Sequence, residues 1–299
     1  MVSVVITAYN VAEYIEQAIK SVLNQELKDL EVIVVLDKPT DNTKEVVEKV
    51  IKETKDKRIL VVENEQNVGA GLSRRIGVEH TKGDYIMLLD GDDWIEPSFL
   101  KNLYDKAIEM DADIVSGGVT IREMATPYYE IQSCGNCVTE GYDKIVKFWG
   151  LKTVFMNNRI YKRYLFDKVP YSHRRYIEDT PTIIPMLWYA NKVVYVDEVG
   201  YNYRLNPKSL THTSSWFKEF VFKGLCWCDL VEFFNTHDPE VYKHLDIRNY
   251  IKTIINQINT HIFTANEVNE YPAEYAEFMM RLSNLISINQ INYKNGRNQ

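Results

Sequence analysis

A run of apolar residues that ends in a cluster of carboxylates occupies residues 85–93, with the sequence Tyr85-Ile86-Met87-Leu88-Leu89-Asp90-Gly91-Asp92-Asp93. Its unbroken apolar part is typical of a strand that is buried on both faces of a sheet. Similar runs precede it, and amphipathic stretches with helical spacing lie between them. We expect strands at Ser3–Tyr9, Leu30–Leu36, Ile59–Val62 and Tyr85–Leu89, and helices at Ala12–Leu23, Asp41–Ile51 and Leu72–Glu79. This alternation predicts an α/β fold in which helices flank a mostly parallel sheet.

The composition of the 299-residue chain is that of a folded protein. Hydrophobic residues make up 45% of it, which is enough to bury one large core or two modest ones and excludes a disordered chain. The net charge of -7 argues against binding of nucleic acid by bulk electrostatics. No stretch approaches the ~18 apolar residues that cross a bilayer, and the first residues lack the pattern of a secretory signal. We therefore expect a cytoplasmic protein, including one at the inner face of the cell membrane.

Polar residues follow each of the expected strands. In a parallel sheet, ligands bind outside the carboxyl ends of the strands, where loops and helix amino termini converge. The residues expected at that edge are Thr7, Ala8, Tyr9 and Asn10 after the first strand, Asp37, Lys38 and Thr40 after the second, Asn67, Gly69 and Gly71 after the third, and Asp90, Gly91, Asp92 and Asp93 after the fourth.

The carboxylates of Asp90, Asp92 and Asp93 are the strongest chemical signal in the chain. Like charges this close repel one another, and a divalent cation would remove the repulsion. Oxygen ligands suit Mg²⁺ or Mn²⁺, and a metal with open positions can hold a diphosphate. The alternative is a solvated acidic turn before the helix that follows Pro97. The location at the end of a buried strand favours the metal site.

Two common phosphate-binding motifs are absent from the sequence. No GxGxxG follows the first strand, and no GxxxxGK[ST] occurs anywhere. Nucleotide binding would therefore depend on a metal and polar side chains.

A set of segments, taken in order, resembles family 2 glycosyltransferases of the GT-A fold, which has a Rossmann-like sheet. The segments are Thr7-Ala8-Tyr9-Asn10, Asp37 with Thr40-Asp41-Asn42-Thr43, Asn67-x-Gly69-x-Gly71-Leu72-Ser73-x-Arg75, Leu89-Asp90-Gly91-Asp92-Asp93-Trp94-Ile95, Glu178-Asp179, and Tyr201-Asn202-Tyr203-Arg204-x-Asn206-Pro207-x-Ser209. The resemblance implies a catalytic domain over residues 1–215, with a nucleotide-sugar half at about 1–120 and an acceptor half at about 121–215.

The activity that the resemblance implies is transfer of a hexosyl or N-acetylhexosaminyl group, with inversion, from a nucleotide diphosphate sugar, usually a UDP-sugar. The acceptor would be a saccharide or a lipid-linked molecule in the synthesis of cell-surface polysaccharides or glycoconjugates. A non-catalytic nucleotide-sugar binding protein is the alternative. A nucleotidyltransferase fits less well, because the first loop lacks a glycine-rich basic segment. Asp92 together with Asp179 favours turnover.

The resemblance also implies roles for residues in donor binding. The turn Thr7-Ala8-Tyr9-Asn10 and Asp37 resemble nucleoside contacts, with Tyr9 against the base. Arg74 or Arg75 resembles the basic residue that approaches the donor. Asp90 and Gly91 belong to the DxD motif, with Asp90 on the ribose side. Arg204 and Lys208 are candidate diphosphate contacts, and surface solvation is the alternative for both.

The resemblance further implies a metal shell for Mn²⁺ or Mg²⁺. Asp92 resembles the direct ligand, Asp90 lies beside it, and His212 resembles the histidine that completes the shell.

The pair Glu178-Asp179 precedes the apolar stretch Ile183–Trp188. Taken alone, the pair is typical of a helix N-cap. The resemblance instead implies that Asp179 is the general base and that Glu178 orients Asp179 or the acceptor.

The sequence departs from the family after the second strand. Members commonly read Asp-Asp-Gly-Ser-Thr-Asp, whereas this chain reads Leu36-Asp37-Lys38-Pro39-Thr40-Asp41. Pro39 stiffens the turn.

Aromatic-rich helical patterns replace the alternation from Trp216 onward, so we expect a C-terminal helical region at 216–299 with a polar end. Its apolar positions are Phe217, Phe220, Val221 and Leu225, then Tyr250, Ile254 and Ile258. Core packing explains this pattern best, and the alternatives are peripheral membrane association or a homodimer interface. A Cys134-x-x-Cys137 pair and a Cys226-x-Cys228 pair could supply a zinc site, but their spacing favours ordinary reduced cysteines.

Overall fold

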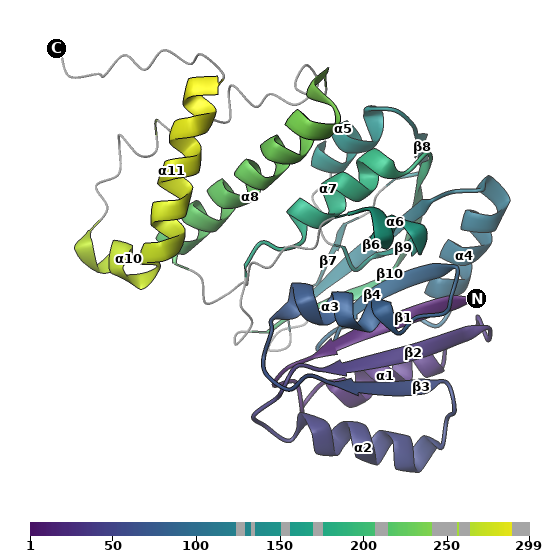
Figure 1. The fold of residues 1–299 in the computed structure, drawn as a ribbon. Helices are drawn as coiled ribbons and strands as arrows, with labels where there is room; N and C mark the ends of the chain where they lie inside the picture. The colour runs from purple at the N-terminus through teal and green to yellow at the C-terminus, as the bar shows by residue number, and fades with distance from the viewer. Residues whose placement is uncertain are drawn as a thin grey trace. The chain divides into compact units, whose positions relative to one another are not determined.

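The computed structural model describes residues 1–123, 129–132, 135–150, 156–169, 176–206, 215–240, 256 and 264–288 (Figure 1). The chain divides into two compact units, Met1–Ser209 and Leu210–Gln299. This boundary precedes the expected one at residue 215 by a few residues. The division of the catalytic domain into a nucleotide-sugar half and an acceptor half stays a prediction.

One mixed sheet forms the centre of the first unit. Among the described strands its order is β3-β2-β1-β4-β9-β6-β10-β5, with β7 beside β6 and β8 beside β10. The strands are β1 (Val2–Ala8), β2 (Leu30–Leu36), β3 (Ile59–Glu63), β4 (Tyr85–Asp90), β5 (Trp94–Ile95), β6 (Ile114–Glu123), β7 (Tyr129–Gln132), β8 (Cys137–Thr139), β9 (Arg159–Lys162) and β10 (Val193–Leu205). The first four strands are parallel, as predicted, whereas β9 runs antiparallel between β4 and β6.

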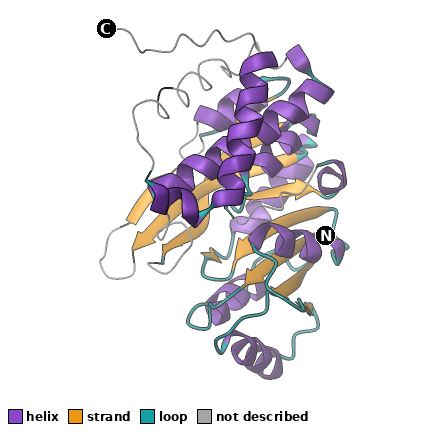
Figure 2. Ribbon diagram, turned by 60° about the vertical axis from the view of Figure 1, so that its left-hand side comes forward, coloured by secondary structure: helices purple, strands orange, loops and turns teal. Residues whose placement is uncertain are grey.

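Helices cover the parallel part of the sheet on both faces (Figure 2). The helices of this unit are α1 (Ile15–Leu23), α2 (Thr43–Thr54), α3 (Ala70–Glu79), α4 (Phe99–Met110), α5 (Asp143–Gly150), α6 (Tyr164–Lys168) and α7 (Thr180–Tyr189). The apolar face of α1 joins the same buried core as Val4 and Ile6. On the other face, α3 lies so close that a Cβ on Gly77 would be 2.3 Å from Val5 and 2.9 Å from Val35. Alternate residues of β1 therefore contact different helix layers.

All three predicted helices begin at other residues than expected, and the one expected at Asp41 starts at Thr43. The helix expected at Ala12 starts at Ile15, because the backbone N–H of Ala12 donates to the Asp41 side chain across the sheet edge. The helix expected at Leu72 starts earlier, at Ala70, directly after Gly69 with its φ of 87°. Only glycine adopts such a φ without strain, so Gly69 turns the chain from the loop after β3 into α3.

The register of the parallel strands brings the predicted polar residues together. Thr7 pairs with Asp90, and Ala8 pairs with Leu36, the residue before Asp37. The loops after β1, β2 and β4 therefore share one edge of the sheet, as the sequence predicts.

The second unit contains α8 (Trp216–His237), α10 (Ala265–Glu270) and α11 (Pro272–Ile288). The helices α8 and α11 pack closely, since a Cβ on Gly224 would be 2.3 Å from the Phe278 ring, and Arg281 pairs with Asp229 at 2.8 Å. The predicted apolar stripe of α8 is buried, which confirms core packing for Phe217, Phe220, Val221 and Leu225. Tyr250, Ile254, Ile258 and the polar end lie outside the described residues.

The described residues hold neither a membrane span nor a cluster of metal ligands. They contain no helix that combines the length and the apolarity needed to cross a membrane. Cys137, Cys226 and Cys228 are unbridged, and no group of three or more His, Cys, Asp or Glu side chains in this part of the chain is arranged to hold a metal. Cys134 lies outside it.

Candidate active site

The turn after β4 is held against the end of β1. The N–H of Gly91 donates to the Thr7 carbonyl at 2.9 Å, and the Thr7 hydroxyl donates to Asp90 Oδ1 at 3.4 Å. A Cβ at Gly91 would lie 2.8 Å from that carbonyl oxygen and 3.0 Å from Val11. Glycine is therefore required at position 91 for the acidic turn to approach β1 this closely.

Asp93 anchors the acidic turn to β10. Its carboxylate accepts hydrogen bonds from the Tyr201 hydroxyl and, at 2.8 Å, from the backbone N–H of Arg204. Burial, together with the charges of Asp92 and Asp90, raises the pKa of Asp93 well above its usual range. Asp93 is 1% exposed, so it fixes the turn to β10 rather than facing a ligand.

Asp92 has little compensation for its charge. Asn206 Nδ2 donates to its Oδ2 at 3.3 Å. Burial and the nearby charge of Asp90 raise the pKa of Asp92. A carboxylate in this state is stabilised by a cation.

Arg74 occupies the centre of the site. Its Nη2 donates to Asp90 Oδ1 at 3.0 Å, and its Nη1 donates to Glu178 Oε1 at 3.0 Å and to Asp179 Oδ1 at 2.5 Å. The guanidinium is buried, which disfavours its charge, but the three carboxylates together hold the pKa of Arg74 well above its ordinary value. One side chain from α3 thus joins the acidic turn to the segment before α7.

Glu178 and Asp179 are a pair of partly buried carboxylates. Burial and the charge of Asp179 raise the pKa of Glu178 to about 7. Burial also raises the pKa of Asp179, although Arg74 opposes the shift. Asp179 stands at the N-cap position of α7, but within this fully described helix its side chain makes no capping hydrogen bond. Its carboxylate accepts from Arg74 instead, and a role as general base stays a prediction.

The backbone before this pair is strained. Ile177 has a φ of 57°, which a β-branched residue rarely adopts. Strained residues cluster at functional sites, where the surrounding structure holds them in place.

The loops after β1 and β2 are joined by reciprocal hydrogen bonds. Asn10 Oδ1 accepts from the N–H of Thr40 at 2.8 Å, and Asn10 Nδ2 donates to the Thr40 hydroxyl at 3.1 Å. The ring of Tyr9 is 46% exposed beside them. Lys38 has a φ of 55°, in the left-handed region that glycine adopts without strain.

Asp37 has a structural role that sequence reasoning missed. Its carboxylate accepts from the N–H groups of Val68 and Gly69 and from Asn64 Nδ2, each at 2.9 Å, and the residue is 3% exposed. These bonds fix the loop that leads into α3, and hence the position of Arg74. Contact between Asp37 and a nucleoside base stays a prediction.

The other predicted cations differ in their surroundings. Arg75 is half-exposed and pairs with Glu79 at 3.0 Å, so of the two neighbouring arginines it is Arg74 that contacts the acidic cluster. Arg204 is 4% exposed, which is inconsistent with surface solvation. Its guanidinium lies 4.6 Å from the ring centroids of Tyr14 and Trp94, and its Nε donates to the Asp92 carbonyl at 2.7 Å. Arg204 thus braces the acidic turn, and a diphosphate contact stays a prediction.

Asn157 is the site residue that sequence analysis missed. Its Nδ2 donates to Asp90 Oδ2 at 2.6 Å and to the Tyr201 hydroxyl oxygen at 3.3 Å. The contact depends on how β9 pairs with β4, which no local pattern in the sequence reveals. The predicted residues Lys208 and His212 lie outside the described residues.

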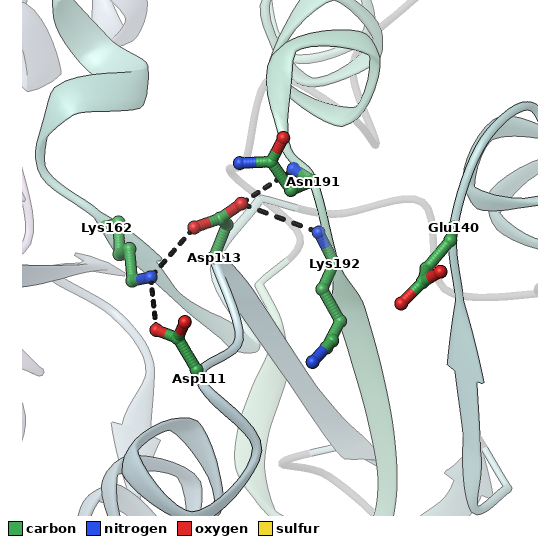
Figure 3. Close-up of a pocket in the computed structure, with 6 residues that line it drawn as sticks. All are labelled: Asp111, Asp113, Glu140, Lys162, Asn191 and Lys192. Atoms are coloured by element: carbon green, nitrogen blue, oxygen red, sulfur yellow. Dashed lines mark hydrogen bonds and ion pairs between the residues drawn. The ribbon is translucent and has the colours of Figure 1, made fainter.

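A cavity of about 280 Å³ lies at the opposite edge of the sheet, where β6 and β10 begin (Figure 3). Lys162 Nζ pairs with Asp111 at 2.8 Å and with Asp113 at 3.0 Å, and the N–H of Asn191 donates to Asp113 at 2.6 Å. Lys162 thus pairs with both Asp111 and Asp113 in this cavity. The candidate active site is instead the acidic turn at Asp90, Asp92 and Asp93, together with Arg74.

The acidic turn offers part of a ligand set for a divalent cation. Asp92 and Asp90 offer carboxylate oxygens close enough to raise the pKa of Asp92. Mg²⁺ and similar ions are commonly held by one or two carboxylates together with substrate phosphates. These two side chains would hold such an ion when a diphosphate supplies further ligands.

Comparison with known proteins identifies the family. Residues 3–170 match the family described as Glycosyl transferase family 2, so this chain belongs to that family and is a glycosyltransferase. GlyG, a glycosyltransferase of Streptococcus pneumoniae, is 27% identical over 234 residues, which are 74% of this chain and 77% of GlyG. EpsJ, an uncharacterized glycosyltransferase of Bacillus subtilis, is 31% identical over 219 residues, which are 71% of this chain and 63% of EpsJ.

A solved structure confirms the fold. The crystal structure of S. aureus TarS 1–349 matches with a TM-score of 0.59 at 17% identity, covering 98% of this chain and 93% of that chain. The same protein has been solved with UDP and with UDP-GlcNAc. The likeness confirms the GT-A fold that the sequence predicts.

The raised pKa of Glu178 predicts a stability that depends on pH. The folded state holds a proton on Glu178 up to about pH 7, whereas the unfolded chain releases it near its ordinary value of 4.5. The stability from this group is therefore present below pH 4.5 and is lost as the pH rises through 7. In urea unfolding, Glu178→Gln should reduce the loss of stability between pH 5 and pH 8 by about 1–3 kcal/mol relative to the wild type.

Glu79→Gln is the matched control, because Glu79 is an exposed carboxylate of the neighbouring helix α3. It should leave the pH dependence of the wild type unchanged. Identical curves for Glu178→Gln and the wild type would show that Glu178 titrates normally.

Proposed function

We propose that this protein is an inverting, divalent-metal-dependent glycosyltransferase that uses a UDP-sugar as its donor and a saccharide or a lipid-linked molecule as its acceptor. The observation that carries the proposal is the Arg74 bridge, which brings Asp90 of the acidic turn and the Glu178-Asp179 pair to one guanidinium. A donor held at the acidic turn would thus lie within reach of a carboxylate from a distant part of the chain.

The roles of the nucleotide-binding residues follow from their positions. The exposed ring of Tyr9 offers a surface for the base, beside the Asn10–Thr40 junction. Asp90 lies on the ribose side and Asp92 on the diphosphate side. UDP is the first nucleotide to test, because the complexes of TarS contain UDP and UDP-GlcNAc. The N-acetylhexosaminyl group is accordingly the first sugar to test.

Asp179 is the proposed general base. It takes the proton of the acceptor hydroxyl as the acceptor oxygen attacks the anomeric carbon. The bond from that carbon to the diphosphate oxygen breaks, and UDP leaves with the electron pair. Attack on the face opposite the leaving group inverts the anomeric centre. Glu178 and Arg74 hold Asp179 in place, and the cation, when bound by Asp92 and Asp90, neutralises charge on the diphosphate.

We also propose that the protein acts in the synthesis of polysaccharides or glycoconjugates. Both GlyG and EpsJ are bacterial glycosyltransferases by name, which agrees with such a role.

Metal dependence is tested by the release of UDP from a panel of UDP-sugars. With Mn²⁺ the wild type should release UDP, and a chelator should abolish the release. Asp92→Ala should lower the rate by at least ~100-fold, because the charge of the leaving diphosphate is then poorly compensated. Release that is unaffected by the chelator and equal in Asp92→Ala would contradict the assignment.

The general base is tested with Asp179→Asn. The variant should bind UDP within about threefold of the wild type by calorimetry, while sugar transfer falls at least ~100-fold, the usual scale for loss of a general base. Asp105→Asn, an exposed carboxylate on α4, is the control and should transfer at the wild-type rate. Transfer near the wild-type rate in Asp179→Asn would remove it from this role. A wild type that binds UDP-sugars without turnover would favour the non-catalytic alternative.

A further inference from the structure

Asn157 lies opposite Asp90 because of the pairing between β9 and β4. In this antiparallel pair, Tyr85 faces Lys162, and Met87 faces Ile160. The same register, continued beyond the end of β9, brings Asn157 opposite Asp90. Asn157 lies in the turn directly before β9, and its Nδ2 donates to Asp90 Oδ2 at 2.6 Å.

The orientation of the Asn157 amide is fixed by its neighbour. An ionised carboxylate can only accept hydrogen bonds, so the amide nitrogen and not its oxygen must face Asp90. The Tyr201 hydroxyl donates to Asp93, which leaves its oxygen to accept from the same amide nitrogen at 3.3 Å. Asn157 thus connects the carboxylates at both ends of the acidic turn through neutral groups.

This orientation leaves a buried acceptor without a partner. Asn157 Oδ1 is buried and meets no donor among the described residues. Such an atom lowers stability, and native structures contain few of them. An apolar side chain of similar volume would remove this unpaired acceptor, but it would also remove the donor to Asp90 Oδ2. That donor is what asparagine supplies at position 157 and an apolar side chain cannot.

Arg74 holds the other oxygen of Asp90. Its Nη2 donates to Oδ1 at 3.0 Å, and the Thr7 hydroxyl donates to the same atom at 3.4 Å. Without the amide, the Asp90 carboxylate could rotate about its side-chain bonds and keep its bond to Arg74. The direction in which the Asp90 carboxylate oxygens face a ligand would then vary.

We propose that Asn157 is a positioning residue, whose amide fixes the orientation in which Asp90 meets both Arg74 and the nucleotide-sugar donor. This inference rests on the proposed function, since it requires that Asp90 contacts the donor. Asn157 itself acts through Asp90. Hydrogen-bonding partners of ligating carboxylates have a comparable role, and their loss typically weakens binding or activity 10–100-fold.

The test uses Asn157→Leu and Asn157→Ala in the full-length protein, with UDP and Mn²⁺ as the binding probe. Both variants should raise the Kd for UDP about 10–100-fold by calorimetry, and the KM for the UDP-sugar should rise to match in the UDP-release assay. If the substitutions only damaged the fold, fewer molecules would be active. The apparent kcat would then fall, and the KM for the UDP-sugar would stay unchanged.

Asn158→Leu is the matched control. Asn158 is the adjacent asparagine and is equally buried, but its Nδ2 donates to the Gly117 carbonyl away from the acidic turn. The Kd of this variant for UDP should stay within about threefold of the wild type.

A double variant shows whether Asn157 acts through Asp90. In an Asp90→Asn background, Asn157→Leu should change the Kd for UDP less than threefold, because the carboxylate that it positions is already gone. Wild-type UDP affinity in both Asn157 variants would overturn the inference, as would equal effects with and without Asp90. Failure of the wild type to bind UDP at all would instead overturn the proposed function.

Discussion

The site depends on one buried positive charge. The Arg74 guanidinium lies among Asp90, Glu178 and Asp179, and it contacts all of them within 3.0 Å. Three partly buried carboxylates without a cation would repel one another and would take up protons or move apart. The position of Arg74 therefore controls both the acidic turn and the candidate base.

The fold fixes Arg74 by its packing on the sheet. Gly77 lets α3 approach β1 and β2 within van der Waals contact, and Asp37 holds the loop before α3 through the N–H groups of Val68 and Gly69. On the other side of the acidic turn, Asp93 and Arg204 attach it to β10. Asp92 lies in the turn between these two anchors, and burial together with the charge of Asp90 raises its pKa. It is therefore the proposed contact for a cation and a diphosphate.

Much of this arrangement could be predicted from the sequence. Unbroken apolar runs predicted the parallel strands, because a strand buried on both faces has no polar alternation. Since ligands bind at the carboxyl ends of such strands, the position of the acidic turn could also be predicted. The contacts of Arg74 with Asp179 and of Asn157 with Asp90 could not be predicted, since each joins segments that only strand order and register bring together. Arg204 was also hard to interpret, because a charged residue becomes buried only when aromatic rings such as Tyr14 and Trp94 cover it.

The most direct test of the account is the free energy of unfolding of Arg74→Met, measured in urea at pH 8 alone and together with Asp179→Asn. We predict that Arg74→Met lowers stability by about 3–5 kcal/mol, because buried carboxylates lose their counter-charge. Adding Asp179→Asn should recover at least ~1 kcal/mol of the loss, since one of those charges is then removed. Losses that simply add in the double variant would contradict the claim that Arg74 is the cation on which the site depends.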